Sequence, residues 1–196
     1  MYDECITFKQ HVDCVAKTIA RNIGVMNKLK YFIPKRILHT LYCTLVLPYL
    51  NYNILIWGST CKTYMDKIVK LQKWAMRTIS CSHYRSHTDP IFAEFKMLKV
   101  FDMFTLELGS FMFKYSSNDL PPVFANYFKK RSEIHNYTTR YKDNYHYTNN
   151  KRTFSDHSVR TLGPHLWNSL DKSIQNSKTL KQFRNKLKQN FISNYV

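Results

Sequence analysis

The stretch LYCTLVLPYLNYNILIWG, Leu41–Gly58, decides how the rest of this chain folds. No charged side chain occurs from Thr40 to Cys61, although the chain of 196 residues has a formal net charge of +17. A segment that excludes charge so completely is buried in protein or in lipid. In lipid, the amides of Asn51 and Asn53 at its middle would each cost several kcal/mol. We therefore expect a central helical core segment rather than a membrane span.

The composition favours a helical protein with a polyanionic partner. Hydrophobic residues make up 44% of the chain and aromatic residues 15%, which is enough for globular packing. Only 4 Gly and 6 Pro interrupt the chain, which suits long helices. Because 30 Lys and Arg face 13 Asp and Glu, we expect nucleic acid as the partner, with an anionic membrane surface as the weaker alternative.

The cysteines and the N-terminal sequence predict an intracellular protein of the nucleus or cytoplasm. The five cysteines are widely spaced and form no C-x-x-C pair, as in proteins with reduced thiols that lie mostly in the core. The first residues, MYDECITFKQ, show neither the basic nor the apolar region of a secretory signal.

Apolar residues at steps of three and four predict two helices in the first 58 residues. The first covers 8–31 and begins with a capping box made by Thr7 and Gln10. The second follows Pro34, is kinked or broken at Pro48 and stops at Gly58. The periodicity leaves open whether residues 49–57 are helical or extended.

The third predicted helix, which Thr63 and Asp66 begin, has an apolar side and a basic side. Its basic side holds Lys67, Lys70, Lys73 and Arg77, at steps of three, three and four. Four like charges on adjacent turns weaken an isolated helix, and an anionic partner would reverse that cost. We interpret them as phosphate contacts; the alternative is a solvated face. Trp74 flanks this side and is open to base stacking or to ordinary packing.

One cluster resembles metal ligands: Cys81, His83 and His87, with Asp89 nearby. The spacing matches no closed four-ligand pattern, so we expect no metal ion and no other cofactor in this chain.

The second half continues as short helices around a basic loop. Helices are predicted to begin at Asp89, at Asp102 and at Pro121. The segment 129–152 interleaves tyrosines with basic residues, and we expect a mobile or partner-ordered loop that builds no core. Its candidate nucleic-acid contacts are Arg140, Tyr141 and Lys142; a solvated loop is the alternative.

The C-terminal part is predicted to contain one extended stretch and two helices. Phe154, Val159 and Leu162 indicate a short strand, and Gly163-Pro164 turns the chain into a helix. A second capping box, Thr179-x-x-Gln182, opens a basic terminal helix. The sequence thus predicts a mainly α helical bundle in three parts, 1–128, 129–160 and 161–196.

Motifs of common catalytic sites are missing from the sequence. There is no P-loop, dinucleotide-binding glycine motif, zinc-protease motif or G-x-S-x-G elbow. The acids are scattered singly, whereas two-metal phosphoryl transfer needs carboxylates that converge on two cations. From its residues alone, the chain is a basic helical nucleic-acid-binding module without a catalytic centre.

The order of several motifs resembles the region after the palm in reverse transcriptases of non-LTR retrotransposons, with the jockey-like group most similar. The first two are the stretch Leu41–Gly58 and LQKWAMRTI at Leu71–Ile79. The others are HTDPIFAEFKMLKVFD at His87–Asp102, LPPVFANYF at Leu120–Phe128, HNYTTR at His135–Arg140, GPHLWNSL at Gly163–Leu170 and FRNKLK at Phe183–Lys188.

This resemblance implies a helical thumb and C-terminal region that grips RNA or an RNA–DNA duplex. Lys67, Lys70, Lys73 and Arg77 then become candidate duplex contacts, while Arg140 and Trp167 match motifs without an assigned role. Fingers, endonuclease and the palm with its Mg²⁺-binding aspartates have no counterpart here, so we expect no polymerisation by this chain alone. The missing palm and fingers are a possible partner. The alternative is a non-catalytic helical protein-interaction module derived from such an element.

Overall fold

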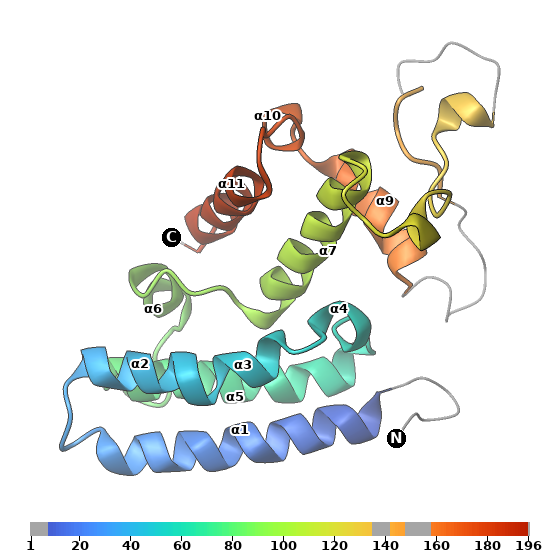
Figure 1. The fold of residues 1–196 in the computed structure, drawn as a ribbon. Helices are drawn as coiled ribbons and strands as arrows, with labels where there is room; N and C mark the ends of the chain where they lie inside the picture. The colour runs from blue at the N-terminus through green and yellow to red at the C-terminus, as the bar shows by residue number, and fades with distance from the viewer. Residues whose placement is uncertain (1–7, 135–141, 148–157, 196) are drawn as a thin grey trace. The chain divides into compact units, whose positions relative to one another are not determined.

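The computed structural model describes residues 8–134, 142–147 and 158–195, which are mainly helical and contain no β-strand (Figure 1). The predicted mainly α fold class is confirmed. The chain divides into two compact units, Met1–Phe104 with Asn190–Val196, and Thr105–Gln189. This division falls inside two helices, after Phe104 and after Gln189, whereas the sequence suggested boundaries after residues 128 and 160. Each unit is described by itself below.

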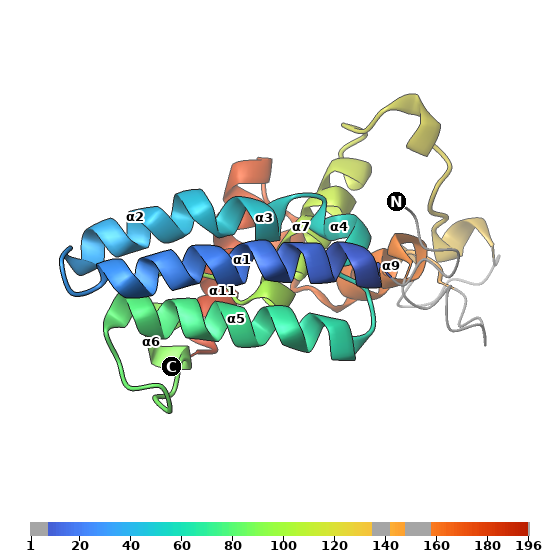
Figure 2. The ribbon, with the colours of Figure 1, turned by 90° about the horizontal axis from the view of Figure 1, so that it is seen from below.

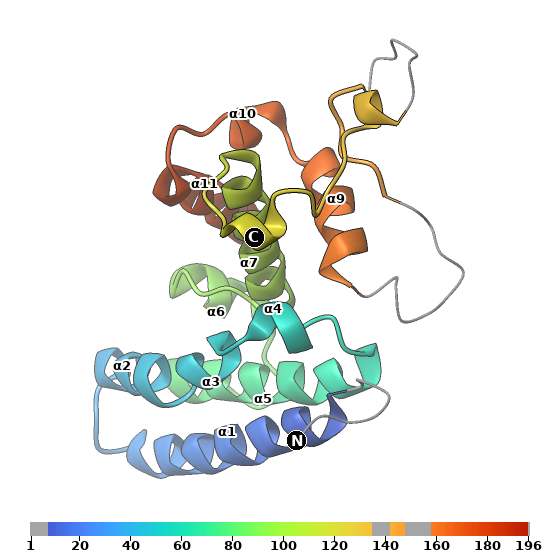
Figure 3. The same ribbon diagram turned by 45° about the vertical axis from the view of Figure 1, so that its right-hand side comes forward.

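The first unit is a helical bundle in which two long helices run side by side in the same direction (Figure 2). The intervening helices run back along the first one (Figures 1 and 3). The helices of this unit are α1 (Lys9–Leu29), α2 (Lys35–Leu45), α3 (Leu47–Asn51), α4 (Ile54–Trp57), α5 (Lys62–Ser80), α6 (Asp89–Glu94) and the start of α7 (Val100–Ser116). The apolar sides of α1 and α5 are buried as their periodicity predicts.

The uncharged stretch Leu41–Gly58 is mostly helical and is broken twice, and only one side of it lies in the core. The residues of this side are at most 1% exposed: Tyr42, Val46, Leu50, Ile54 and Trp57. The expectation that the whole stretch is buried is therefore wrong, because its other side is exposed at Thr44, Pro48, Tyr49, Asn51, Tyr52, Asn53 and Ile56. The first break precedes Pro48, where the Asn22 amide donates to the Leu45 carbonyl at 2.5 Å. The second is at Asn53, which has a left-handed backbone with φ 49°. Among the described residues, no helix is both long and apolar enough to cross a membrane.

Buried Gln72 joins α5 to α2 and to the start of α7. Its Nε2 donates to the Tyr42 hydroxyl at 3.1 Å and to the Leu98 carbonyl at 2.9 Å. Its Oε1 accepts from the Val100 N–H at 2.9 Å. The side chain is 1% exposed and the amide is satisfied at both ends, so this contact favours one arrangement of the three elements.

Three predicted helix starts have a different local structure. Helix α5 begins at Lys62, so Thr63 lies inside it and caps nothing. Asp89 pairs with Lys99 at 3.0 Å instead of capping α6. Asp102 accepts from the Tyr195 hydroxyl, and burial raises the pKa of this carboxyl. Thr7 of the first predicted capping box lies outside the described residues.

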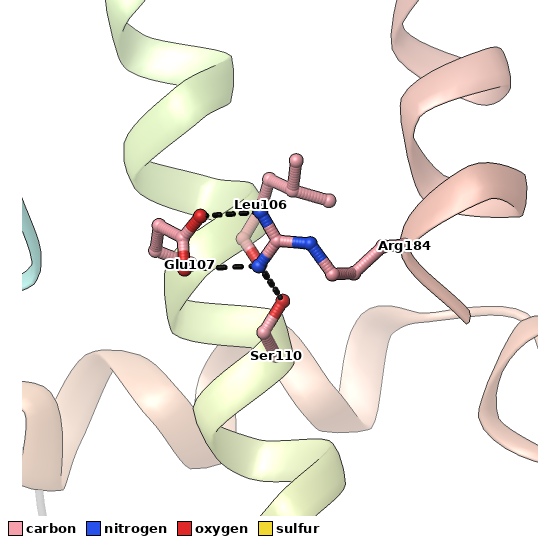
Figure 4. A network of polar contacts seen from close by, with 4 residues as sticks. All are labelled: Leu106, Glu107, Ser110 and Arg184. Carbon is pink, nitrogen blue, oxygen red and sulfur yellow. Dashed lines mark hydrogen bonds and ion pairs between the residues drawn. The ribbon is translucent and has the colours of Figure 1, made fainter. Parts of the chain in front are cut away.

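The second unit is assembled on the rest of α7. Its other elements are η1 (Pro122–Phe124), η2 (Arg131–Glu133), α9 (Val159–Ser169), α10 (Lys172–Gln175) and α11 (Leu180–Ser193). Arg184 of α11 binds Glu107 of α7 through two nitrogens, at 3.0 and 2.6 Å, and Ser110 at 2.9 Å (Figure 4). This residue, one of those that make the predicted terminal helix basic, therefore joins α11 to α7.

Helix α9 corrects the prediction of a strand followed by a Gly-Pro turn. Val159 and Leu162 are helical, and Gly163-Pro164 lies within the helix; Phe154 is outside the described residues. A side chain at Gly163 would place its Cβ 2.7 Å from the Met112 sulfur, so the glycine permits close contact between α9 and α7. Half of the predicted capping box at α11 is present, since the Gln182 N–H donates to the Thr179 hydroxyl at 3.2 Å. The Gln182 side-chain oxygen accepts from the Lys178 N–H, at 3.0 Å, instead of from Thr179.

The prediction that residues 129–152 build no core is wrong for Tyr145. This ring is 6% exposed and contacts Phe128 and Tyr115. Both backbone groups of Tyr145 bind the Asn168 side chain, at 3.0 and 2.8 Å. In the described part of the segment, the backbone around Lys130 pairs antiparallel with that around Tyr145. Tyr145 is therefore not available for base stacking.

Cysteines in the described part of the chain are not core residues, which corrects the interpretation of their spacing. Cys14, Cys61 and Cys81 are exposed, and Cys43 is half-buried.

Candidate nucleic-acid interface

Two of the four predicted α5 cations have partners within the first unit. The Lys67 ammonium forms an ion pair with Asp13 of α1 at 2.7 Å. Half-buried Arg77 donates from Nε to the Ser86 carbonyl at 2.9 Å, which holds the segment after α5 against the helix. Arg77 and Lys67 therefore already have contacts within the unit, and the interpretation of all four side chains as phosphate contacts stays a prediction.

The other two cations, Lys70 and Lys73, keep their charge unpaired within the described residues. Lys70 is exposed and Lys73 is half-exposed, and neither has an ion pair or hydrogen bond there. Asp66 lies one turn before Lys70, but no ion pair joins them. These two ammonium groups are free to meet phosphate oxygens.

A groove of about 640 Å³ lies between α1 and α5, beside Lys70. Its lining combines three small or apolar side chains with three ammonium groups and one carboxylate. It is lined by Asp13, Ala16, Lys17, Ala20, Lys67, Lys70 and Leu71. The hydrogen bond from Lys67 lowers the pKa of Asp13, and nearby Lys9 and Lys17 lower it further. The Asp13 carboxylate is thus charged and paired with Lys67, and the net charge of the groove lining is positive.

Helix α1 adds a second row of cations that sequence reasoning did not place beside α5. Lys17, Arg21 and Lys28 are exposed, and their spacing of four and seven residues puts them on one side of α1. Lys17 and Lys70 line the same groove, so the row on α1 lies beside the row on α5. We call Lys17, Arg21, Lys28, Lys70 and Lys73 the α1–α5 basic face. The amphipathic pattern of α1 predicts that these cations are exposed. It does not predict which helix lies beside them, because that depends on how the helices pack.

Trp74 remains compatible with either predicted role. Its side chain is 40% exposed, on the turn of α5 that follows Lys70 and Leu71. Its carbonyl accepts a hydrogen bond from Thr78 within the helix.

The loop candidates are only partly described. Arg140 and Tyr141 lie outside the described residues, and Lys142 is exposed in the second unit. The Lys142 carbonyl accepts from the Ser132 N–H at 3.0 Å, so its backbone has a defined place in the antiparallel pairing.

The possible metal ligands after α5 do not converge. Within residues 8–134, 142–147 and 158–195, no group of three His, Cys, Asp or Glu side chains could hold a metal ion. His83 instead packs against Tyr84, with 4.5 Å between ring centroids.

Comparisons with family models, curated proteins and solved structures give no match to this chain.

Proposed function

We propose that this chain is the nucleic-acid-binding thumb and C-terminal region of a non-LTR reverse transcriptase and that it binds RNA or an RNA–DNA duplex without sequence preference. One observation supports the proposal most: two parallel helices expose the α1–α5 basic face, whose groove contains a single carboxylate, already matched by Lys67. Such a face meets a phosphate backbone with little loss of existing contacts. The proposed role is binding, and the catalytic carboxylates would belong to a palm outside this chain.

The proposal predicts binding that depends steeply on salt and on Lys70 and Lys73. Each lysine that neutralises a phosphate adds about one to the slope of log K against log salt. For the double variant Lys70→Glu/Lys73→Glu, we expect weaker binding to every duplex sequence and a slope that is shallower by about two. Fluorescence anisotropy with labelled RNA–DNA duplexes of different sequence, at several NaCl concentrations, measures both quantities.

A control variant with the same charge change on the second unit distinguishes the effect of the α1–α5 basic face on binding from the effect of net charge. Lys178 and Lys181 are exposed, and Lys178→Glu/Lys181→Glu alters the net charge by the same amount. We expect this control to retain most of the affinity and the full slope. Equal losses in the two variants, or binding by the unmodified chain that is insensitive to salt, would contradict the proposal.

An interaction with the missing palm, or with another protein, is a second candidate. It is favoured by Tyr49, Tyr52 and Ile56, which are exposed apolar or aromatic side chains in and between α3 and α4. In this case the isolated chain would bind a hydrophobic dye, and replacement of these three side chains with Ser would reduce that binding.

A further inference from the structure

One end of the first unit exposes three aromatic rings among cations. Tyr31 and Phe32, in the turn between α1 and α2, are 79% and 83% exposed. Tyr84, in the segment between α5 and α6, is 65% exposed. Single exposed rings are common on a surface, whereas a group of them at one end of a unit indicates a contact site.

These two segments lie at the same end because α1 and α5 are parallel. The ion pair between Asp13 and Lys67 aligns the helices near their beginnings, and both helices end on the same side (Figure 2). From these residues the helices run 16 and 13 further residues, to Leu29 and Ser80. At 1.5 Å per residue, their ends differ by only about 5 Å along the axis.

Both segments are held by hydrogen bonds, so the backbone that carries the rings has a defined position. The Phe32 N–H donates to the Leu29 carbonyl at 2.9 Å. In the other segment, Arg77 donates to Ser86 at 2.9 Å and the Ser82 N–H donates to the Arg77 carbonyl at 3.0 Å. Arg77, which the sequence suggested as a duplex contact, is thereby a positioning residue for the segment that contains Tyr84.

The charge around the rings selects an anionic ligand. No acidic residue occurs in 28–36 or in 81–87, whereas Lys28, Lys30, Lys35, Arg36 and Arg85 do. Lys30 Nζ lies 5.0 Å from the Tyr31 ring centroid, and the Arg85 guanidinium carbon lies 5.1 Å from that of Tyr84. A planar ring paired with a cation fits a nucleotide, whose base stacks while its phosphate meets the charge.

We infer that Tyr31, Phe32 and Tyr84 stack on the unpaired bases of a nucleic-acid strand that extends from a duplex bound to the α1–α5 basic face. Duplex bases are covered by their neighbours and offer no ring face to side chains, whereas single strands do. The inference rests on the proposed function, because the row Lys17, Arg21 and Lys28 leads along α1 to Tyr31. It adds that the preferred ligand is a duplex with a single-stranded extension.

The test compares a blunt RNA–DNA duplex with the same duplex carrying an unpaired extension. For the unmodified chain we expect affinity for the extended duplex to be about 5-fold to 100-fold higher, as for one stacked base. The variant Tyr31→Ala/Phe32→Ala/Tyr84→Ala is expected to bind both duplexes equally, with unchanged affinity for the blunt one. Tyr52→Ala, an exposed tyrosine before α4, is the matched control and is expected to keep the preference.

A second readout reports stacking directly. The fluorescence of 2-aminopurine in the extension should fall when the unmodified chain binds and stay high with the triple variant. The inference is overturned if the unmodified chain shows no preference, or if the triple variant keeps it. It is also overturned if the rings matter only for binding to phosphatidylserine vesicles, which would indicate a membrane surface. Loss of blunt-duplex binding in Lys70→Glu/Lys73→Glu is measured separately, so failure of the stacking site and failure of the basic face are distinguishable.

Discussion

At the scale of single residues, several polar side chains have partners from distant parts of the sequence. Asn22 binds a carbonyl where α2 ends, Gln72 binds groups of α2 and α7, and Asn168 holds Tyr145 by its backbone. Each satisfies a backbone group that would otherwise lose its hydrogen bond. His11 is different, because its Nε2 is buried and has no hydrogen-bond partner in the part of the chain that the structure describes, and its ring lies 5.7 Å from that of Trp57.

Because Nε2 of His11 is buried, we predict that the free energy of unfolding decreases in mild acid. Burial lowers the pKa of His11 below its usual value of 6.5, so the unfolded chain takes up this proton first as the pH falls. The free energy of unfolding is therefore expected to decrease as the pH drops below about 6.5 and to be insensitive to His11 above it. Urea unfolding followed by circular dichroism at pH 7.5 and pH 5.5 measures the change.

The variant His11→Phe is the control for this prediction, because it keeps a ring beside Trp57 but has no titrating group. We expect its stability to change less between the two pH values than that of the unmodified chain. An identical loss in both proteins would assign the effect to other groups.

At the scale of elements, the space around a glycine differs from one site to another. At Gly58, after α4, a Cβ would lie 2.5 Å from the Ile54 carbonyl oxygen and 2.6 Å from the Phe104 ring. At Gly24, in the middle of α1, nothing lies within 4 Å of an added Cβ. The same residue type thus has a steric role at one site and none at the other.

These two glycines give opposite predictions for the same substitution. Gly58→Ala is expected to destabilise the first unit by about 1–3 kcal/mol, because backbone and ring must move apart. Gly24→Ala is expected to stabilise it by about 0.5–1 kcal/mol, because alanine loses less conformational freedom in a helix. Urea midpoints of the two variants provide the measurement, and a destabilised Gly24→Ala protein would contradict the geometry of α1.

At the scale of the whole molecule, charge repulsion outweighs attraction. The net charge is +17, and the described residues contain three ion pairs, Lys67–Asp13, Lys99–Asp89 and Arg184–Glu107, all partly exposed. Partly exposed pairs contribute little to stability, whereas a large net charge disfavours the compact state.

Salt is therefore predicted to stabilise the free protein while it weakens nucleic-acid binding. Between 10 and 100 mM NaCl the Debye length falls from about 30 to about 10 Å, which screens the repulsion among cations. We expect Tm to rise over this range. The rise should be smaller in Lys178→Glu/Lys181→Glu, whose net charge is lower by four, since each replacement changes it by two. A Tm that falls with salt would show that the ion pairs dominate.

The sequence by itself determined the mainly helical class and, for α1 and α5, which side of the helix is buried. The apolar sides of α1 and α5 and the cap at Thr179 follow from local spacing and local hydrogen bonds. Such patterns depend only on residues within one or two turns of each other, so they can be recognised in the sequence without knowledge of the tertiary structure.

Only the tertiary structure decided which cations are free and which rings are exposed. Lys67 and Arg77 find partners at Asp13 and Ser86, Tyr145 is buried, and Lys17 comes to lie beside Lys70. These outcomes depend on the direction and separation of elements far apart in the chain. A periodic pattern predicts that a side chain points away from the core, but it does not predict which residues that side chain contacts on the surface.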